Sequence, residues 1–363
     1  EIQAVIDSVN TIVANETAAI SELVEDLNGN ANTNLITAAQ LEDIRGVTGV
    51  NPANIAEYNA AFVPAAFADI NSPTVAEINA VILSVNTIVA NENAALNELK
   101  EDIAGNTNND LIEASELNAI RGVAGALQAN QAEYQAAFTA SPSPFADTAN
   151  PTPAEIQAVI DSVNTIVANE TAAISELVED LNGNANTNLI TAAQLEDIRG
   201  VTGVNPANIA EYNAAFVPAA FADINSPTVA EINAVILSVN TIVANENAAL
   251  NELKEDIAGN TNNDLIEASE LNAIRGVAGA LQANQSEYQA AFTASPSPFT
   301  DTANPTPAEI NAVILSVNTI VANENAALNE LKEDIAGNTN NDLIEASELN
   351  AIRGVAGALQ ANQ

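Results

Sequence analysis

The feature that most constrains this chain is an internal repeat: the motif AVIxSVNTIVANE occurs five times along its 363 residues. The starts of the five modules are spaced by 76, 78, 76 and 78 residues. A regular period indicates an array of small folded units that pack against their neighbours. The modules start at Glu1, Glu77, Glu155, Glu231 and Glu309.

Two module types are present, A in the first and third modules and B in the others. The first two modules are nearly identical to the next two, since only Ala132/Ser286 and Ala146/Thr300 differ. This identity indicates recent duplication, so the older difference between types A and B is more informative. We also expect a longer array, because the chain starts beyond a TPA and ends before an EYQAAF. With caps and connectors, the predicted modules are 1–73 (A), 74–151 (B), 152–227 (A), 228–305 (B) and 306–363 (B, truncated).

Each module is predicted to open with a long amphipathic helix. In the second module, Thr74 and Glu77 form a T-x-x-E capping box, and Gly105 ends the helix. The apolar positions between them alternate in steps of four and three, which is the stripe of a helix of about 28 residues. Glu92, in the segment ANENA, interrupts this stripe. We favour one continuous helix; a bend at Glu92 is the alternative.

Two further helices are predicted in each module, over EASELNAIRGV and over QANQAEYQAAF in type B. No segment shows the alternation of a β-strand. The connectors are rich in Pro and Ser, yet each carries one Phe, such as Phe67 or Phe145, that we expect to dock on a neighbour. A flexible tether is the alternative. The predicted fold is therefore all-α: a tandem array of small three-helix-bundle-like modules forming a rod or solenoid.

The composition excludes several functions. Lys and Arg number 8 and Asp and Glu number 48, a formal charge of −40. This charge repels nucleic acid and anionic lipid. The chain has no Cys and no His, which excludes thiol and Ser-His-Asp catalysis and the usual zinc ligands. No apolar run approaches the length of a membrane span, and no signal peptide is seen. We therefore expect no enzyme, no nucleic-acid partner and no membrane insertion in this segment.

The strongest candidate site is the loop GNTNNDLIEASEL of type B modules. Its oxygen-bearing side chains and its aliphatic residue resemble an EF-hand loop, and the loop–helix units of dockerins. One register lacks the sharp-turn Gly, and the other lacks good ligands at its first positions. The resemblance implies calcium ligands at Asn106, Asn108, Asp110, Glu113, Glu116, Asn260, Asn262, Asp264, Glu267, Glu270, Asn338, Asn340, Asp342, Glu345 and Glu348.

Type A modules provide an internal comparison. Their loop reads NANTNLITAAQL, which keeps oxygen atoms but has no carboxylate at the ligand positions. A divalent cation would be held very weakly there. The loop therefore has a structural use without metal, and a turn in which Asn side chains bond to the backbone is the alternative in type B as well.

Three repeated polar residues, represented by Arg121, Glu92 and Tyr134, have two interpretations each. The Arg of IRGV is interpreted as a clamp within its module; a salt bridge between modules or chains is the alternative. The Glu of ANE is interpreted as a bend that faces solvent, with a buried polar contact or metal site as the alternative. The Tyr is interpreted as core packing with its hydroxyl at the surface rather than as a binding aromatic.

The whole chain resembles the repeat regions of large acidic bacterial surface proteins, such as adhesins and biofilm-matrix or filament proteins. The resemblance implies a structural, extracellular role at a cell surface, in which modules associate with neighbouring modules or with other copies. The alternative is an array of helical modules that binds a soluble or host protein, with repetition providing avidity.

Overall fold

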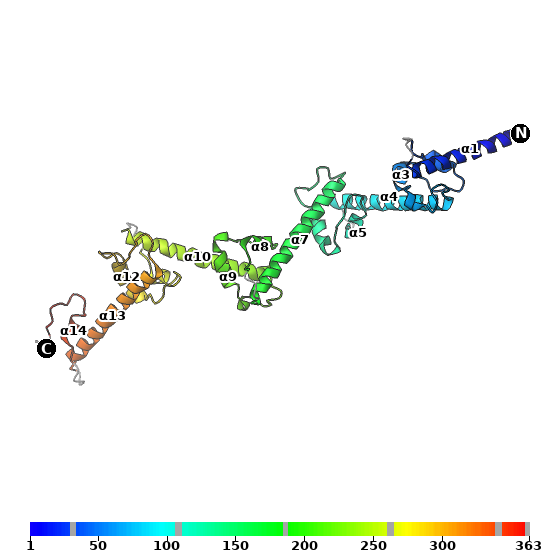
Figure 1. Ribbon diagram of the computed structural model, residues 1–363. Coiled ribbons are helices and arrows are strands. Elements are labelled where there is room, and N and C mark those ends of the chain that lie inside the picture. Colours follow the sequence, from blue (N-terminus) through cyan, green and yellow to red (C-terminus); the bar gives the residue numbers. More distant parts are fainter. Residues whose placement is uncertain (30–33, 106–110, 184–187, 260–264, 338–342, 360–363) are drawn as a thin grey trace. The chain divides into compact units, whose positions relative to one another are not determined.

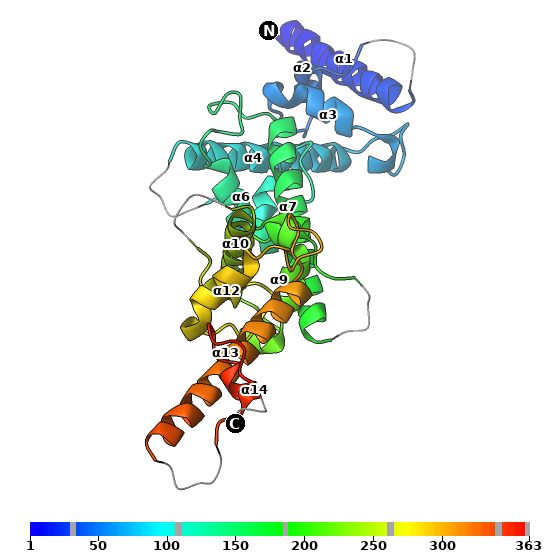
Figure 2. The same cartoon turned by 90° about the vertical axis from the view of Figure 1, so that its left-hand side faces the viewer.

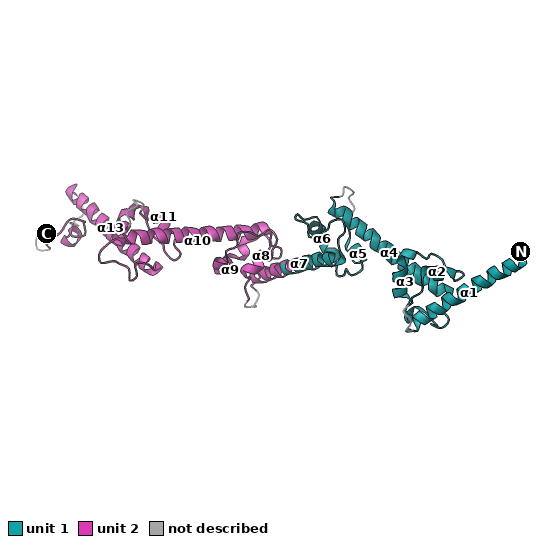
Figure 3. Cartoon of the chain, turned by 90° about the horizontal axis from the view of Figure 1, so that it is seen from above, with its two compact units in different colours: residues 1–169 teal, residues 170–363 magenta. Residues whose placement is uncertain are grey.

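The computed structural model describes residues 1–29, 34–105, 111–183, 188–259, 265–337 and 343–359. Among these residues there are helices, turns and connectors but no β-strand, so the all-α prediction is confirmed. The helices recur in the same order in successive repeats (Figure 1). The chain divides into two compact units, Glu1–Asn169 and Glu170–Gln363, which Figure 3 colours separately.

A long helix opens each module and runs without interruption through the ANE segment. In α4 the Thr74 hydroxyl accepts the N–H of Glu77, and the Glu77 carboxylate accepts the N–H of Thr74, at 3.3 and 2.8 Å. The helix ends just before Gly105, whose φ of +78° favours glycine. The predicted continuous helix is therefore confirmed. The long helices are α1 (Ile2–Leu27), α4 (Val75–Ile103), α7 (Pro153–Leu181), α10 (Val229–Ile257) and α13 (Pro307–Ile335).

The second helix is shorter than predicted. In type B it ends at Leu117, because the Asn118 side chain accepts the N–H of Ala126 and donates to its carbonyl, at 3.1 and 2.8 Å. These bonds fold the following residues back as a loop instead of continuing the helix. The second helices are α2 (Ala38–Asp43), α5 (Ala114–Leu117), α8 (Ala192–Asp197), α11 (Ala268–Leu271) and α14 (Ala346–Leu349).

A third helix follows in the first four modules, each time after one turn of 3-10 helix. Asn51 caps this turn in type A, since its side chain accepts the N–H of Ala53 at 3.1 Å. The 3-10 turns are η1 (Pro52–Asn54), η3 (Gln128–Asn130), η4 (Pro206–Asn208) and η6 (Gln282–Asn284). The helices are α3 (Ile55–Ala61), α6 (Gln131–Phe138), α9 (Ile209–Ala215) and α12 (Gln285–Phe292), and type A connectors add η2 (Pro64–Ala66) and η5 (Pro218–Ala220).

Each hydrophobic core contains side chains from two consecutive repeats. In unit 1, one core combines the second half of α4 and the helices α5 and α6 with the start of α7. The other combines the second half of α1, α2 and α3 with the start of α4. Unit 2 contains the two equivalent cores. The residues that close each core therefore belong to the long helix of the following module.

One long helix in each unit serves two cores. In α4, Ile78 and Ile82 are buried in one core, and Ala95 and Leu99 are buried in the other. Helix α10 repeats this arrangement in unit 2. Figures 1 and 2 show α3 packed against the first half of α4, which is the contact that closes the first core.

The Phe residues of the connectors are buried, as the sequence predicts. Phe67 packs on Phe62 with ring centroids 6.1 Å apart, and Phe145 packs on Phe138 at 5.8 Å. Both connectors therefore contribute to the cores that they follow.

Candidate functional site

The predicted calcium loops lie only partly within the described residues. Nine of the fifteen predicted ligands fall outside them, so the structure does not place these side chains. These nine are Asn106, Asn108, Asp110, Asn260, Asn262, Asp264, Asn338, Asn340 and Asp342. Among the described residues, no group of three or more Asp and Glu side chains is arranged to hold a metal ion.

The six Glu residues that are described act as helix caps. Glu116 accepts the backbone N–H of Glu113 at 2.8 Å, at the start of α5. Type A achieves the same cap without charge, since Gln40 accepts the N–H of Thr37 at 2.9 Å. Capping thus accounts for this position in both module types, and a metal-binding role for Glu116 stays a prediction. The other type B pairs, Glu267 with Glu270 and Glu345 with Glu348, make the same bond.

A buried aspartate that the sequence analysis missed closes the base of the same loop. Asp102, near the end of α4, accepts the N–H of Ile112 at 2.8 Å, across ten residues. The signal in the sequence was an Asp and an Ile at this separation in all five modules. The equivalent pairs are Asp26 with Ile36, Asp180 with Ile190, Asp256 with Ile266 and Asp334 with Ile344. In each module the Asp carboxylate accepts the Ile N–H in place of a backbone carbonyl. The loops of types A and B are therefore closed by the same hydrogen bond.

The Glu that interrupts the helix stripe is paired with the Arg of the same module. Glu92 is buried, and it accepts the backbone N–H and the Nε–H of Arg121 at 3.3 and 2.7 Å. The interpretation of this Glu as a bend that faces solvent is wrong, and the alternative of a buried polar contact is right. The predicted clamp within the module is confirmed. The same pairs are Glu16 with Arg45, Glu170 with Arg199, Glu246 with Arg275 and Glu324 with Arg353.

The Arg of each type B module also bonds to the preceding module. Arg121 Nη1 donates to Glu57 of α3 at 3.2 Å. Both carboxylates raise the pKa of Arg121, the Glu92 hydrogen bond being the larger cause. Correspondingly, the hydrogen bond from Arg275 lowers the pKa of Glu211. Because the Arg side chains are half exposed, these ion pairs are expected to stabilise the junction only modestly.

A network of Tyr and Asn side chains forms the centre of each junction. Tyr212 of α9 is fully buried, and its hydroxyl donates to Asn240 of α10 at 2.6 Å while it accepts the N–H of Asn205 at 2.9 Å. Asn240 also accepts from Asn208 and donates to the carbonyl of Gly203. The expected core packing is right, but the expected surface position of the hydroxyl is wrong. The network recurs at Tyr58, Tyr134 and Tyr288 with Asn86, Asn164 and Asn318.

The Glu of each capping box holds the connector as well as the helix. Besides its cap, Glu309 accepts the backbone N–H of Thr300 at 2.9 Å. The backbone N–H groups of Thr306 and Thr300 lower the pKa of Glu309 to about 2. The pKa values of Glu77, Glu155 and Glu231 are lowered too. The hydrogen bond from the cap Thr hydroxyl is the larger cause, and the hydrogen bond from the connector N–H adds to it.

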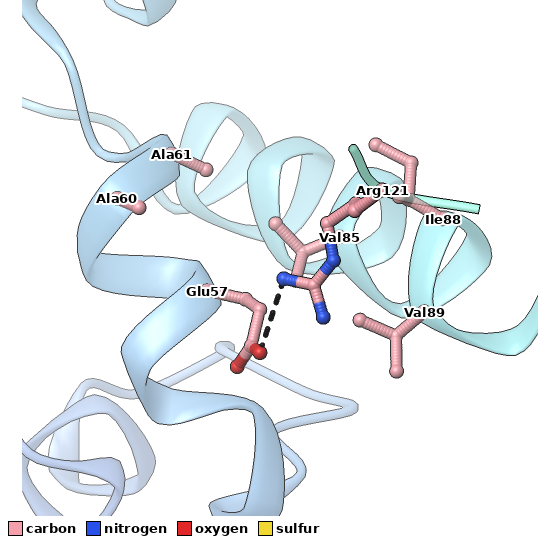
Figure 4. A pocket seen from close by; sticks show the side chains of 7 residues that line it. All are labelled: Glu57, Ala60, Ala61, Val85, Ile88, Val89 and Arg121. Carbon is pink, nitrogen blue, oxygen red and sulfur yellow. Dashed lines mark hydrogen bonds and ion pairs between the residues drawn. The ribbon is translucent and has the colours of Figure 1, made fainter. Parts of the chain in front are cut away.

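A shallow apolar groove lies beside each Arg bridge that joins two modules. The first groove has a volume of about 230 Å³, and Figure 4 shows Glu57 and Arg121 facing each other over its Val and Ala side chains. Two grooves in unit 2 have the same kinds of residue around Arg275 and Arg353. The grooves are lined mainly by aliphatic side chains, with one ion pair at the rim.

Comparison with known proteins adds no relative: the chain matches no protein-family model, no curated protein and no solved structure. Within the described residues, none of the helices is both long enough and apolar enough to cross a bilayer.

Proposed function

We propose that this chain is a non-enzymatic structural repeat protein, part of an extracellular filament, stalk or matrix at a bacterial cell surface. In this role its modules hold other parts of an assembly apart, and calcium in the type B loops stiffens them. The sequence contains no His or Cys, which supports a role without catalysis of the usual hydrolase kinds.

The observation that carries the proposal is the sharing of helices between cores. Within each unit, consecutive cores are joined by one continuous helix, α4 or α10, rather than by a linker. Bending such a joint would break helix hydrogen bonds or pull apart a packed core. A spacer needs this resistance, because a flexible tether would not fix the distance between its ends.

The junction bonds support the same role. The Tyr–Asn network and the capping-box Glu tie each long helix to the preceding repeat through backbone and side-chain groups. Buried polar networks of this kind specify one geometry, because any other arrangement leaves buried groups without hydrogen bonds.

A distance measurement tests the proposal. Leu83 and Leu237 are equivalent, exposed positions two modules apart, and the chain lacks Cys, so Cys at both sites allows specific labelling. A spacer predicts one narrow distribution of distances by single-molecule energy transfer, unchanged between low and high salt. A broad distribution that contracts with added salt, as expected for a flexible acidic tether, would refute it. The same labelled chain in concentrated urea provides the control for a flexible state.

A second candidate function, binding of a soluble or host protein, is favoured by the recurrence of the groove beside Arg121, Arg275 and Arg353. Equivalent sites in tandem would provide avidity. This function predicts several equivalent binding events per chain in calorimetry with a candidate partner. Substituting Ile88, which lines the first groove and is half exposed, with Asp should remove one event only.

A further inference from the structure

Each type A module has an Asn-Gly pair at the end of its long helix. The pair is Asn28-Gly29 in the first module and Asn182-Gly183 in the third, and the sequence contains no other. Type B modules have Ala and Gly at the same place, as in Ala104-Gly105. Asn28 is exposed and directly follows the last residue of α1, and Gly29 has a φ of +66°. The pair therefore lies at the surface, where the helix ends.

The Asn28 side chain ties this helix end to the connector of its module. Its Nδ2 donates to the carbonyl of Val24 at 2.8 Å and to Oδ1 of Asn71 at 3.3 Å. Both bonds need the amide NH2 group, which a carboxylate does not have. The equivalent bonds in the third module join Asn182 to Val178 and Asn182 to Asn225, at 2.8 and 3.4 Å.

An Asn followed by Gly is well suited to an attack by its own backbone. The nitrogen that attacks Cγ of Asn28 is the backbone nitrogen of Gly29, and Gly has no Cβ to obstruct its approach. A Cβ placed on Gly29 would have no heavy atom within 4 Å, so the space beside this backbone is open. The reaction is intramolecular, which favours it because the two groups are already held close together.

We propose that Asn28 and Asn182 are sites of spontaneous deamidation, through which type A helix ends acquire a carboxylate with time. The bond from Gly29 nitrogen to Cγ forms while the bond from Cγ to Nδ2 breaks, and Nδ2 leaves as ammonia with the proton of the Gly amide. Water then opens the cyclic imide. Its hydroxyl adds to one of the two ring carbonyl carbons and its proton goes to the ring nitrogen, which yields aspartate or isoaspartate. The reaction needs no oxidant, and it does not depend on the proposed structural role.

The fold slows this reaction relative to a free peptide. The Gly29 N–H donates to the carbonyl of Asp26 at 3.1 Å, and the amide of Asn28 is held by its bond to Val24. The helix end must open before the ring can close, and helix ends are among the parts of a fold that open most easily. Breaking these two hydrogen bonds predicts a reaction about five- to 150-fold slower than in the peptide.

Deamidation loosens the contact between α1 and the connector. The new carboxylate accepts hydrogen bonds but donates none, so the bonds to Val24 and Asn71 are lost. Its charge also lies beside the last carbonyl groups of α1, where the helix dipole disfavours an anion. Type B modules keep Ala at this place, so the change is confined to type A.

Ageing the whole chain at mildly alkaline pH tests the proposal. Ion-exchange chromatography counts the added charges, and peptide mass spectrometry locates them. We expect one added negative charge at Asn28 and one at Asn182, formed about five- to 150-fold more slowly than in a synthetic peptide of residues 24–33. Asn28→Ala with Asn182→Ala reproduces the type B pair and should remove both charges. Ala104→Asn reproduces the type A pair at the end of α4 and should add a third.

Three results would overturn the proposal. These are a chain that keeps both amides while the peptide reacts, equal reaction at the remaining Asn residues, and an Ala104→Asn chain that gains no third charge.

The consequence for the fold has its own measurement. Amides of the last turn of α1 should exchange with solvent faster in Asn28→Asp than in Asn28→Ala, by roughly two- to fivefold, because only the first adds an anion at the helix end. Equal exchange rates in these two variants would contradict the loosening.

Discussion

The hydroxyl of Tyr212 is a sharp test of how the junctions are held. Tyr212→Phe keeps the buried ring but removes two hydrogen bonds, the one donated to Asn240 and the one accepted from the N–H of Asn205. A typical intramolecular hydrogen bond contributes about 0.5–1.5 kcal/mol, and a buried donor left without an acceptor costs about 1–3 kcal/mol. We therefore expect this junction to lose about 1–3 kcal/mol.

Native-state hydrogen exchange is the suitable assay, because a chain with several cores is not expected to unfold in one step. The free energy of opening should fall by about 1–3 kcal/mol for amides of α9 and for the start of α10. The amides of α12, whose Tyr288 is unchanged, serve as the internal control. Equal loss in both helices would show that the effect is not local to the junction.

A double-mutant cycle refines the test. Asn240→Ala removes the acceptor of the Tyr212 hydroxyl along with two other bonds. If the network acts as described, the two substitutions together should cost less than their sum, by roughly 0.5–3 kcal/mol. Additive effects within about 0.3 kcal/mol would refute the reasoning that these side chains stabilise the junction through each other.

Three further predictions concern the carboxylates. The lowered pKa of Glu309 means that its ionised form stabilises the fold above the ordinary value of 4.5, and that this stabilisation is lost as pH falls from 4.5 towards about 2. Glu309→Gln should therefore flatten the dependence of the melting temperature on pH in that window. Glu246→Gln should lower the free energy of opening of the α10 and α11 amides in native-state hydrogen exchange by about 1 kcal/mol, because the mostly buried Glu loses its charge while its Arg is half exposed. Glu211→Gln, which removes the second ion pair of the same Arg, should leave this free energy nearly unchanged, because an exposed ion pair contributes little. Millimolar calcium should raise the melting temperature of the chain, and replacing the Asp of every type B loop by Asn should abolish that rise; equal shifts with and without these changes would rule out the loops as calcium sites.

Local features of the fold could be read from the sequence because their causes are local. The capping box of Thr74 and Glu77, the helix end at Gly105 and the docking of Phe67 all depend on residues close to one another along the chain. The predicted length of the second helix was wrong because the Asn118 side chain bonds to the backbone of Ala126, which turns the chain out of the helix. The residues next to Asn118 are compatible with a helix, so the sequence did not reveal this bond.

The junctions could not be predicted in the same way. The second partner of Arg121, Glu57, lies 64 residues away in the preceding module, so no spacing within a module identifies it. Repetition adds a further ambiguity. When modules are nearly identical, a contact with Ile78 of the same module and a contact with its copy in the next module have the same sequence signature. Only the structure shows that the cores are closed by the following repeat.

The shared helices have a consequence for how such an array can change in length. Because each core combines most of one module with the start of the next long helix, a duplication that starts anywhere in the period restores every core, provided that whole periods are added. The type B to type B junction at Asn311, where Asn replaces Gln157 and still bonds to the backbone of Ala278, shows that the order of types can vary too. Copy number can thus rise or fall by recombination between near-identical segments without an intermediate that fails to fold, so the length of the array can change without the loss of any core.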